Sequence, residues 1–312
     1  MKIGVDVMGG DYAPDVVIEG AVDSLQHLVA RDEIFLIGDA NLIHNMLTGL
    51  NIPDGRFTIV PTTQVISMGD VPAKAFAQKP DSSIAVGYRM LKEKEIDGFC
   101  SAGNTGAMLV GVSYTVNVIP GVLRPALATI VPALDNHNSV ILDVGLNPEC
   151  KPDVLMQYGI LGSIFARYIL EAENPTVKLL NIGEEASKGT ATVKAAYELM
   201  NNHPAINFIG NIEGNGLFMN NMPDVIVCDG FVGNVILKQT EAFYHIIKAR
   251  NLKDPFFDNL DFEGIGGTPV IGINANVVIG HGVSKRKAIM NMILQTWAVV
   301  HANLAQKIKE AI

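Results

Sequence analysis

The sequence predicts an α/β fold of three layers, αβα, in which the central sheet is mostly parallel. Short apolar runs alternate along the chain with longer stretches of helical periodicity, and this alternation is typical of strand–helix–strand units. Several apolar runs are near-continuous Val, Ile and Leu, as expected of strands that are buried on both faces. Because no low-complexity linker or internal repeat interrupts the pattern, we expect one domain over residues 1–312, with a small helical subregion at 234–266.

The individual elements follow from the local patterns. In the first expected helix, Val17 and Ala21 fall on one face at helical spacing. Ser83 and Ser284 are the expected N-caps of two helices, and Pro152 is tolerated in the first turn of another. The predicted strands are 2–8, 33–38, 56–60, 97–100, 127–131, 139–144, 177–182, 207–210, 224–228 and 277–279, and the predicted helices are 15–29, 83–94, 107–118, 152–170, 190–201, 234–250 and 284–312.

Composition and charge narrow the classes of function. The chain has 312 residues, of which 48% are hydrophobic, enough for a large core. Its net charge of −9 disfavours nucleic acid as a partner. The cysteines Cys100, Cys150 and Cys228 lie far apart and form no Cys-x-x-Cys pair, so we expect neither a disulfide framework nor a zinc site. With no signal-peptide pattern and no apolar run long enough for a bilayer, a cytoplasmic protein is expected.

Glycine and polar residues follow most of the predicted strands at the point where each strand ends. In a parallel sheet, ligands bind at the carboxyl ends of the strands, so we expect these residues to form one polar pocket. A plain turn is the alternative for any single Gly-Asn or Asp-Gly pair, but the recurrence after successive strands favours a functional site. The segments are 8–14, 101–107, 142–147, 181–189, 210–214, 228–234 and 280–282.

The residue types in these segments suit a small oxyanion. Asparagine amides, glycine N–H groups, hydroxyl groups and a lysine can donate hydrogen bonds to phosphate, or to the oxyanion of a carbonyl under attack. The stretch 101–107 follows a strand and precedes a helix, where N–H groups and the helix dipole favour an anion. No Walker loop, dinucleotide fingerprint, nucleophile elbow or metal-ligand spacing occurs, so we expect neither a metal nor a cofactor.

The motifs also occur in a particular order: DVMGGD at 6–11, SAGNTGA at 101–107, RPALA at 124–128, LDVG at 142–145, NIGEE at 181–185, NFIGN at 207–211 and DGFVGN at 229–234. In this order they resemble the phosphate acyltransferases called PlsX, over nearly the whole chain. The resemblance implies an isocitrate/isopropylmalate dehydrogenase-like fold and a homodimer. It also implies transfer of an acyl group from long-chain acyl-[acyl carrier protein] to orthophosphate, the first step toward phosphatidic acid and phospholipids.

The resemblance further implies which partners the protein meets. They are acyl carrier protein, orthophosphate and a downstream acyltransferase at the membrane, so peripheral contact at the inner face of the membrane is expected as well. Two features depart from the family pattern. Ile265 precedes Gly266-Gly267 where the family often has Tyr, and the region between Asn234 and Gly266 is shorter than in many members.

Combining the donors with the family reaction gives two predicted sets of site residues. Lys188 is the candidate for balancing phosphate charge, with a solvated loop lysine as the alternative. His281 is a candidate acid for the departing thiolate, or a base; the alternative is a structural histidine. The predicted catalytic set is Asn104, Lys188, Asp229 and His281, and the predicted phosphate- or oxyanion-binding set is Ser101, Gly103, Thr105, Gly106, Asp143, Asn147, Asn211 and Asn234.

Two further interpretations concern a thiol and a basic cluster. Cys100 lies next to the 101–107 motif, but inside an apolar strand, so a buried, inert thiol is preferred over an acyl-enzyme nucleophile. Acyl carrier proteins are acidic, and Lys285, Arg286 and Lys287 at the start of the last helix are the candidate docking site for one. A solvated helix face is the alternative for this cluster.

Other functions compete with long-chain acyl transfer. One is a short-chain phosphate acetyltransferase that uses acyl-CoA, and another is a non-catalytic phosphate-binding protein. A nicotinamide dehydrogenase is disfavoured, because the sequence lacks the dinucleotide fingerprint and fold analogy alone is a weak argument for function.

Overall fold

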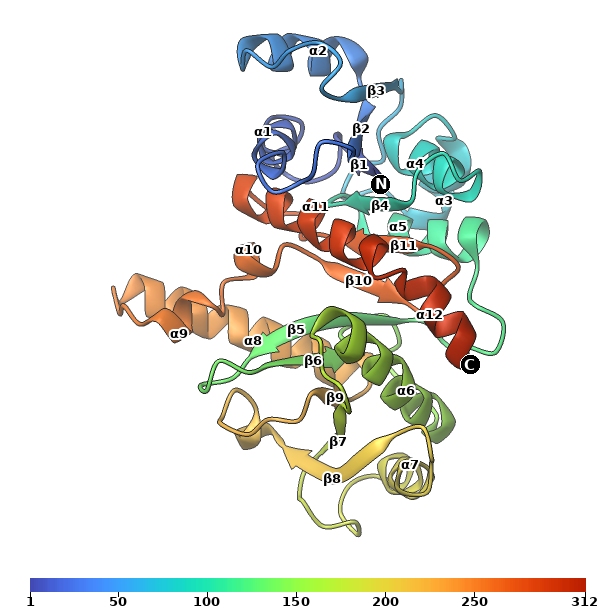
Figure 1. Cartoon of the computed structure of the whole chain (residues 1–312), viewed down its shortest axis with the longest axis vertical. Coiled ribbons are helices and arrows are strands. Elements are labelled where there is room, and N and C mark those ends of the chain that lie inside the picture. The colour runs from blue at the N-terminus through green and yellow to red at the C-terminus, as the bar shows by residue number, and fades with distance from the viewer. The chain divides into compact units, whose positions relative to one another are not determined.

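The computed structural model describes residues 1–312, apart from the side chain of residue 262 (Figure 1). The chain forms two compact units. The first unit comprises residues 1–119 and 262–305, and the second unit comprises residues 120–261 and 306–312. Compactness does not test whether either unit folds alone, so the single domain expected over the whole chain stays a prediction.

In the first unit the strands follow the spatial order β3-β2-β1-β4-β11-β10. The neighbouring strands are parallel, except that β10 and β11 are antiparallel. The strands are β1 (Lys2–Asp6), β2 (Glu33–Gly38), β3 (Thr58–Pro61), β4 (Gly98–Ser101), β10 (Thr268–Ile271) and β11 (Asn276–Ile279). The helices are α1 (Asp15–Ser24), α2 (Ala40–Gly49), α3 (Pro72–Gln78), α4 (Ser83–Lys92), α5 (Thr105–Gly111), which continues as a π-helix over Val112–Val116, α10 (Phe262–Ile265) and α11 (Arg286–His301).

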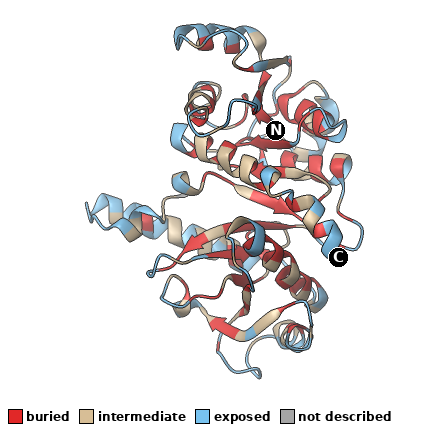
Figure 2. Ribbon diagram, viewed as in Figure 1, coloured by how far each residue is buried: buried red, intermediate tan, exposed pale blue. Residues whose placement is uncertain are grey.

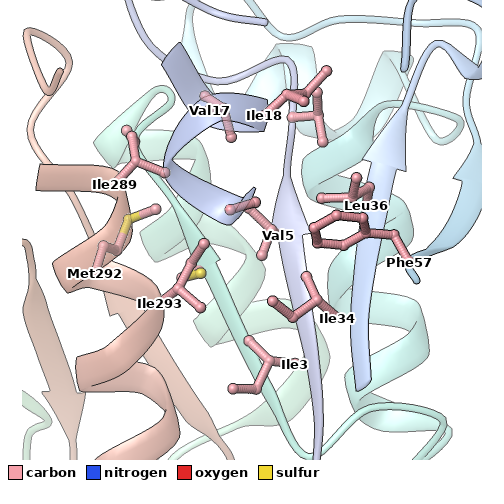
Figure 3. Packing of buried hydrophobic residues seen from close by; sticks show 14 of the residues in the cluster. Ile3, Val5, Val17, Ile18, Ile34, Leu36, Phe57, Ile289, Met292 and Ile293 are labelled. Atoms are coloured by element: carbon pink, nitrogen blue, oxygen red, sulfur yellow. The ribbon is translucent and has the colours of Figure 1, made fainter. Parts of the chain in front are cut away.

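Strand β1 shows how the core of the first unit is layered. Val5 belongs to a cluster of buried hydrophobic residues that includes Ile289 of α11 and is completed by α1 (Figure 3). Gly4 points to the opposite face, because successive residues of a strand alternate; a Cβ there would lie 3.4 Å from the Phe99 ring. That ring packs edge-on against Tyr88 of α4, with centroids 5.4 Å apart. Helices therefore cover both faces of the strands.

In the second unit the strands follow the order β5-β6-β9-β7-β8. Strands β5 and β6 form an antiparallel pair, and the remaining neighbours are parallel. The predicted α/β class with a mostly parallel sheet is confirmed. The strands are β5 (Ala126–Pro132), β6 (Asn138–Leu142), β7 (Thr176–Asn181), β8 (Asn207–Glu213) and β9 (Val225–Val227), and the helices are α6 (Pro152–Ile169), α7 (Ala191–Asn201), a 3₁₀ turn at Gly214–Gly216, α8 (Gly230–Ala249) and α9 (Pro255–Asp258); α12 (Leu304–Ala311) begins in the first unit and ends in the second.

Several elements are absent from the predicted strands and helices, among them α2, α3 and β10. Helices α2 and α3 bury few side chains, namely Ile43 and Leu47 in α2 and Ala75 in α3. Strand β10 contains Pro269, which removes a backbone donor and interrupts the strand pattern. Short helices with few buried positions and a strand that contains a proline thus carry weaker sequence signals than the elements that were predicted.

Two predicted N-caps were wrong, and one predicted helix is divided. Helix α4 is capped by Ser82, whose hydroxyl accepts from the Ala85 N–H, rather than by Ser83. Helix α11 has Lys285 at its N-cap position without a side-chain bond, and Ser284 is buried. The predicted helix 284–312 breaks after α11, where Asn303 adopts a φ of 52°, a left-handed conformation that ends helices.

Candidate active site

The carboxyl ends of β1, β4 and β11 lie at one edge of the first unit, because these three strands are parallel. The loops that follow them are joined through their backbones. The Asp11 N–H donates to the Gly282 carbonyl at 2.8 Å, and the Gly280 N–H donates to the Ser101 carbonyl at 2.8 Å. The structure therefore brings the 101–106 turn, the loop after β1 and the loop that carries His281 together.

A hydrogen-bonded chain of buried groups supports the turn after β4. The Gly103 N–H donates to Ser101 Oγ at 2.9 Å, and the Ser101 hydroxyl donates to Asp6 Oδ2 at 2.6 Å. The other carboxylate oxygen of Asp6 accepts the Met8 N–H at 3.0 Å. Burial raises the pKa of Asp6, while the hydrogen bonds act in the opposite direction. Ser101 and Gly103 thus hold the shape of the turn.

The Asn104 side chain binds the backbone on two sides. Its Oδ1 caps α5 by accepting the Ala107 N–H at 3.0 Å. Its Nδ2 donates to the carbonyls of Ser67, Met68 and Asp70, each at 3.1 Å. Asn104 is 5% exposed. Both hydrogens of its amide group are engaged with this neighbouring loop, so the geometry is that of a bracing residue.

The first turn of α5 is the part of the motif that faces outward. Thr105 is exposed and Gly106 is half-buried. An α-helix leaves its first N–H groups without intrahelical partners, and in the described part of the chain those of Thr105 and Gly106 donate to nothing outside α5. Gly106 also packs closely, because a Cβ there would lie 2.4 Å from Pro72 Cγ. His281 is half-buried in the adjacent loop.

In the second unit, Asp143 organises the loop after β6. Its buried carboxylate accepts the N–H groups of Leu127 at 3.0 Å, Gly145 at 3.2 Å, Leu146 at 3.2 Å and Asn147 at 2.6 Å. The Asn147 amide also donates to it, at 3.0 Å. These backbone and side-chain donors compensate the charge of the buried carboxylate. Asp143 and Asn147 therefore fix the loop 143–147.

The N-terminus of α8 packs directly on that loop. The Gly230 N–H donates to the Asn147 carbonyl at 2.8 Å, and Asn234 Nδ2 donates to the Val144 carbonyl at 3.4 Å. Asp229 caps α8 by accepting a backbone N–H of its first turn. The structure thus brings Asp143, Asn147, Asp229 and Asn234 together at the carboxyl ends of β6 and β9.

Asn211 and Lys188 each contact the loop after β7. Asn211 is 3% exposed, and its Nδ2 donates to the Glu185 carbonyl at 3.1 Å. Its Oδ1 is buried without a hydrogen-bond partner among the described residues. Lys188 is exposed, and its aliphatic stem covers Gly183, where a Cβ would lie 2.8 Å from Lys188 Cγ. Asn211 therefore holds the backbone of the loop, and Lys188 is open to solvent.

The basic cluster at the start of α11 is partly engaged within its own unit. The Arg286 guanidinium donates to the Asp23 carboxylate with two nitrogens, one of them at 2.6 Å, and lies 3.8 Å from Glu19. Arg286 is 52% exposed in its side chain. This pairing lowers the pKa of Asp23 and offsets the charge of Arg286. Lys285 and Lys287 are exposed.

Cys100 is fully buried in β4. Its Sγ lies 3.7 Å from the Gly4 carbonyl, and burial raises the pKa of the thiol to about 12. A thiol in this state is protonated at neutral pH and is a poor nucleophile. The structure therefore supports the inert interpretation of Cys100.

Sequence reasoning missed two residues that shape these loops. Asp6 supports the 101–106 turn, and an acid at the end of an apolar strand was the signal available for it. Tyr158 accepts the Asn147 amide at 2.8 Å from within α6, and a tyrosine inside a helix gives no sequence signal of such a contact. The described residues contain no group of three or more His, Cys, Asp or Glu arranged to hold a metal ion. None of the helices described here is both long and apolar enough to cross a bilayer.

Solved structures with the same fold include phosphotransacetylases. A phosphotransacetylase from Streptococcus pyogenes superposes with a TM-score of 0.67 at 17% identity, covering 96% of this chain and 94% of the other. A 4-hydroxythreonine-4-phosphate dehydrogenase from Burkholderia phymatum gives a TM-score of 0.51 at 14% identity, covering 96% and 98%. These similarities support the predicted isocitrate dehydrogenase-like fold.

Sequence relatives identify the family. A family model described as "Fatty acid synthesis protein" matches residues 1–307. Curated relatives named phosphate acyltransferase include those of Salinibacter ruber, 37% identical over 99% of this chain and 97% of the relative, and Caldicellulosiruptor saccharolyticus, 40% identical over 100% and 98%. The relative from Dictyoglomus turgidum is 39% identical over 100% and 98%. The chain therefore belongs to the PlsX family of phosphate acyltransferases, enzymes of fatty acid and phospholipid synthesis.

Proposed function

We propose that the enzyme transfers a long-chain acyl group from the thioester of acyl carrier protein to orthophosphate. A phosphate oxygen attacks the thioester carbonyl, the carbon–sulfur bond breaks, and acyl phosphate and the carrier thiol are released. Phosphate is already an anionic nucleophile at neutral pH, so the protein has to position it and stabilise the developing oxyanion. The burial of Cys100 supports this direct attack, because a buried, protonated thiol is poorly suited to form an acyl-enzyme.

The observation that carries the phosphate site is the start of α5. There the N–H groups of Thr105 and Gly106 donate to nothing outside α5 among the described residues, Thr105 is exposed, and the neighbouring loop carries the half-buried His281. Donors at a helix N-terminus favour a phosphate or an oxyanion. His281 is the proposed acid for the leaving thiolate, since an imidazole titrates near neutral pH.

The remaining predicted residues divide into two kinds. Ser101, Gly103 and Asn104 are proposed to act by holding the turn, and Asp143, Asn147, Asn211 and Asn234 by holding the loops of the second unit. Lys188 and Asp229 keep their predicted catalytic roles as proposals. Exposure of Lys188 supports its availability to an anion.

The reaction is tested directly by incubating the enzyme with palmitoyl-carrier protein and phosphate. We expect release of carrier thiol that depends on phosphate, and an acyl phosphate that hydroxylamine traps as the hydroxamate. Thiol release that is independent of phosphate would contradict the proposal. Faster turnover of acetyl-CoA than of the palmitoyl donor would favour the short-chain acetyltransferase instead, and phosphate binding without turnover of either donor would favour a binding protein.

We also propose the assembly and location that the family resemblance implies, a cytoplasmic homodimer that docks acyl carrier protein and contacts the inner face of the membrane near a downstream acyltransferase. Helix α8 supports an assembly, because only Gly230, Gly233 and Tyr244 of its 20 residues are buried (Figure 2). The exposure of Lys285 and Lys287 supports a docking site for an acidic carrier protein.

A further inference from the structure

The segment 65–71 of the first unit lies between β3 and α3, and only its Ile66 side chain is well buried. Met68 is 43% exposed and Val71 is 67% exposed. The segment therefore presents apolar side chains to solvent, although its backbone is fixed. Two separate sets of contacts fix it.

Asn104 provides the first set of contacts. Its Nδ2 donates to three carbonyls within 67–70, at 3.1 Å each, while its Oδ1 caps α5. A single amide group thus joins the turn after β4 to this segment. Because the nitrogen of the amide holds the segment and the oxygen caps α5, a substitution can remove one contact and keep the other.

Asp70 and Lys79 provide the second set. Asp70 Oδ2 accepts the Ser67 N–H at 2.9 Å and the Lys79 ammonium at 2.6 Å. Lys79 Nζ also donates to the Val65 carbonyl at 2.7 Å. The lysine lowers the pKa of Asp70. The segment is therefore braced from α3 as well as from α5.

The Met68 side chain of this segment lies against the loop that follows β11. A Cβ added to Gly282 would lie 2.6 Å from Met68 Cε, and the Gly282 carbonyl accepts the Asp11 N–H. Val283, which follows Gly282 in the chain, is 50% exposed, and Tyr12, which follows Asp11, is 48% exposed. Met68, Tyr12 and Val283 together are called the apolar rim below.

We infer that the apolar rim binds the acyl chain of the donor, and that Asn104 is a positioning residue that holds Met68 in that surface. The inference rests on the proposed function, since a long-chain donor must place an apolar tail near the acceptor site. Exposed apolar residues on neighbouring loops at a strand-end site are suited to bind an apolar ligand. The exposed Asp11 carboxylate beside them favours a neutral alkyl chain over a second anionic group.

The first experiment measures dependence on chain length. Met68→Gln keeps the size of the side chain but makes it polar, and should raise KM for palmitoyl-carrier protein about three- to tenfold, while KM for butanoyl-carrier protein is unchanged. Leu42→Gln is the matched control, because Leu42 is 42% exposed on α2. Equal changes for the two donors, or no change for either, would overturn the role of the rim. If wild type makes no acyl phosphate from either donor, it is the proposed function that fails.

The second experiment separates positioning from direct contact with phosphate. Asn104→Ser retains an oxygen that can cap α5 but removes the amide donors to the 67–70 carbonyls. We expect a raised KM for the palmitoyl donor, an unchanged KM for phosphate, and faster amide hydrogen exchange in 67–70. Lys79→Met should give the same pattern, since it loosens the same segment from the other side.

The double variant completes this test. If both residues act through the segment, the combined effect on KM for the palmitoyl donor is smaller than the product of the single effects. A rise in KM for phosphate alone in Asn104→Ser would instead make Asn104 a phosphate ligand and overturn the inference. Multiplicative effects of the two substitutions would do the same. Should Asn104→Ser fail to fold, Lys79→Met and Met68→Gln still decide the question.

Discussion

Asp6 is 1% exposed. Its surroundings include groups that raise its pKa and groups that lower it. Burial is the largest cause and raises the pKa, while the Ser101 hydroxyl and nearby backbone N–H groups lower it. A carboxyl group whose pKa is raised in the folded protein stabilises the fold most when it is protonated. This stabilisation is fully present below the ordinary pKa of the group, and it is lost as pH rises through the higher folded value.

Asp6→Asn should therefore change how stability depends on pH. Wild type should lose stability relative to the variant as pH rises from about 4 toward neutrality, because the amide does not ionise. Urea unfolding of both proteins over this range measures the effect, with the exposed Asp54→Asn as a control. A constant difference between wild type and Asp6→Asn across the range would contradict the prediction.

Thr105 differs from its neighbours in the motif because it is exposed. Thr105→Val preserves the shape of the side chain but removes the hydroxyl. If that hydroxyl binds phosphate, the KM for phosphate should rise about tenfold, the size expected for one hydrogen bond to a charged group. Thr105→Ser keeps a hydroxyl and should stay near wild type. Equal KM values for phosphate in the two variants would count against a role for Thr105.

At the scale of elements, the contact of α8 with the 143–147 loop depends on Gly233. A Cβ there would lie 2.0 Å from the Asp143 carbonyl oxygen and 3.0 Å from Cys228 Sγ. Neither a backbone carbonyl nor a buried thiol can move aside easily, so the start of the helix must shift. The glycine thus sets how closely the helix approaches the loop.

Gly233→Ala should lower the free energy of unfolding by about 1–3 kcal/mol, the cost of overpacking a close contact. Gly214→Ala is the control, because no atom lies within 4 Å of its added Cβ and its φ is not positive. Denaturant unfolding compares them. Equal stability of the two variants would show that the loop accommodates the methyl group.

The start of α11 is the element proposed to dock the carrier protein. Arg286 is bound to Asp23, so its reversal would disturb folding as well as charge. The double variant Lys285→Glu and Lys287→Glu avoids that pair. It should raise KM for acyl-carrier protein and leave KM for phosphate unchanged, with a stronger effect at low salt. The reverse pattern in a steady-state assay would reject the docking site.

At the scale of the whole molecule, the α/β class could be predicted because buried strands have a strong pattern. Strand β2 was predicted with both ends correct at Glu33 and Gly38, since its core is continuous Ile, Phe, Leu and Ile. The role of each site residue was harder to predict from the sequence. Asn104 contacts carbonyls more than 30 residues earlier in the chain, and backbone carbonyls leave no signal in a sequence. A conspicuous polar motif therefore marks the place of a site better than the role of each residue in it.

An exposed apolar stripe on α8 supports the proposed homodimer. Val232, Val235, Phe243 and Ile246 lie on one face at helical spacing and are 37%, 50%, 54% and 56% exposed. A stripe of this kind on a helix with few buried side chains is typical of an interface. Two such stripes from identical chains can bury one another around a two-fold axis.

Phe243→Glu combined with Ile246→Glu should therefore convert a dimer into a monomer, because burying two carboxylates on each side opposes association. Sedimentation equilibrium at micromolar concentration measures the mass of wild type and variant. Leu199→Glu, at a position 44% exposed on α7, is the control and should leave the mass unchanged. A monomeric wild type would remove the homodimer from the proposal, and a double variant that stays dimeric would place the interface elsewhere than on α8. Circular dichroism that matches wild type shows that the double variant is folded, so loss of the dimer then reports on the α8 stripe itself.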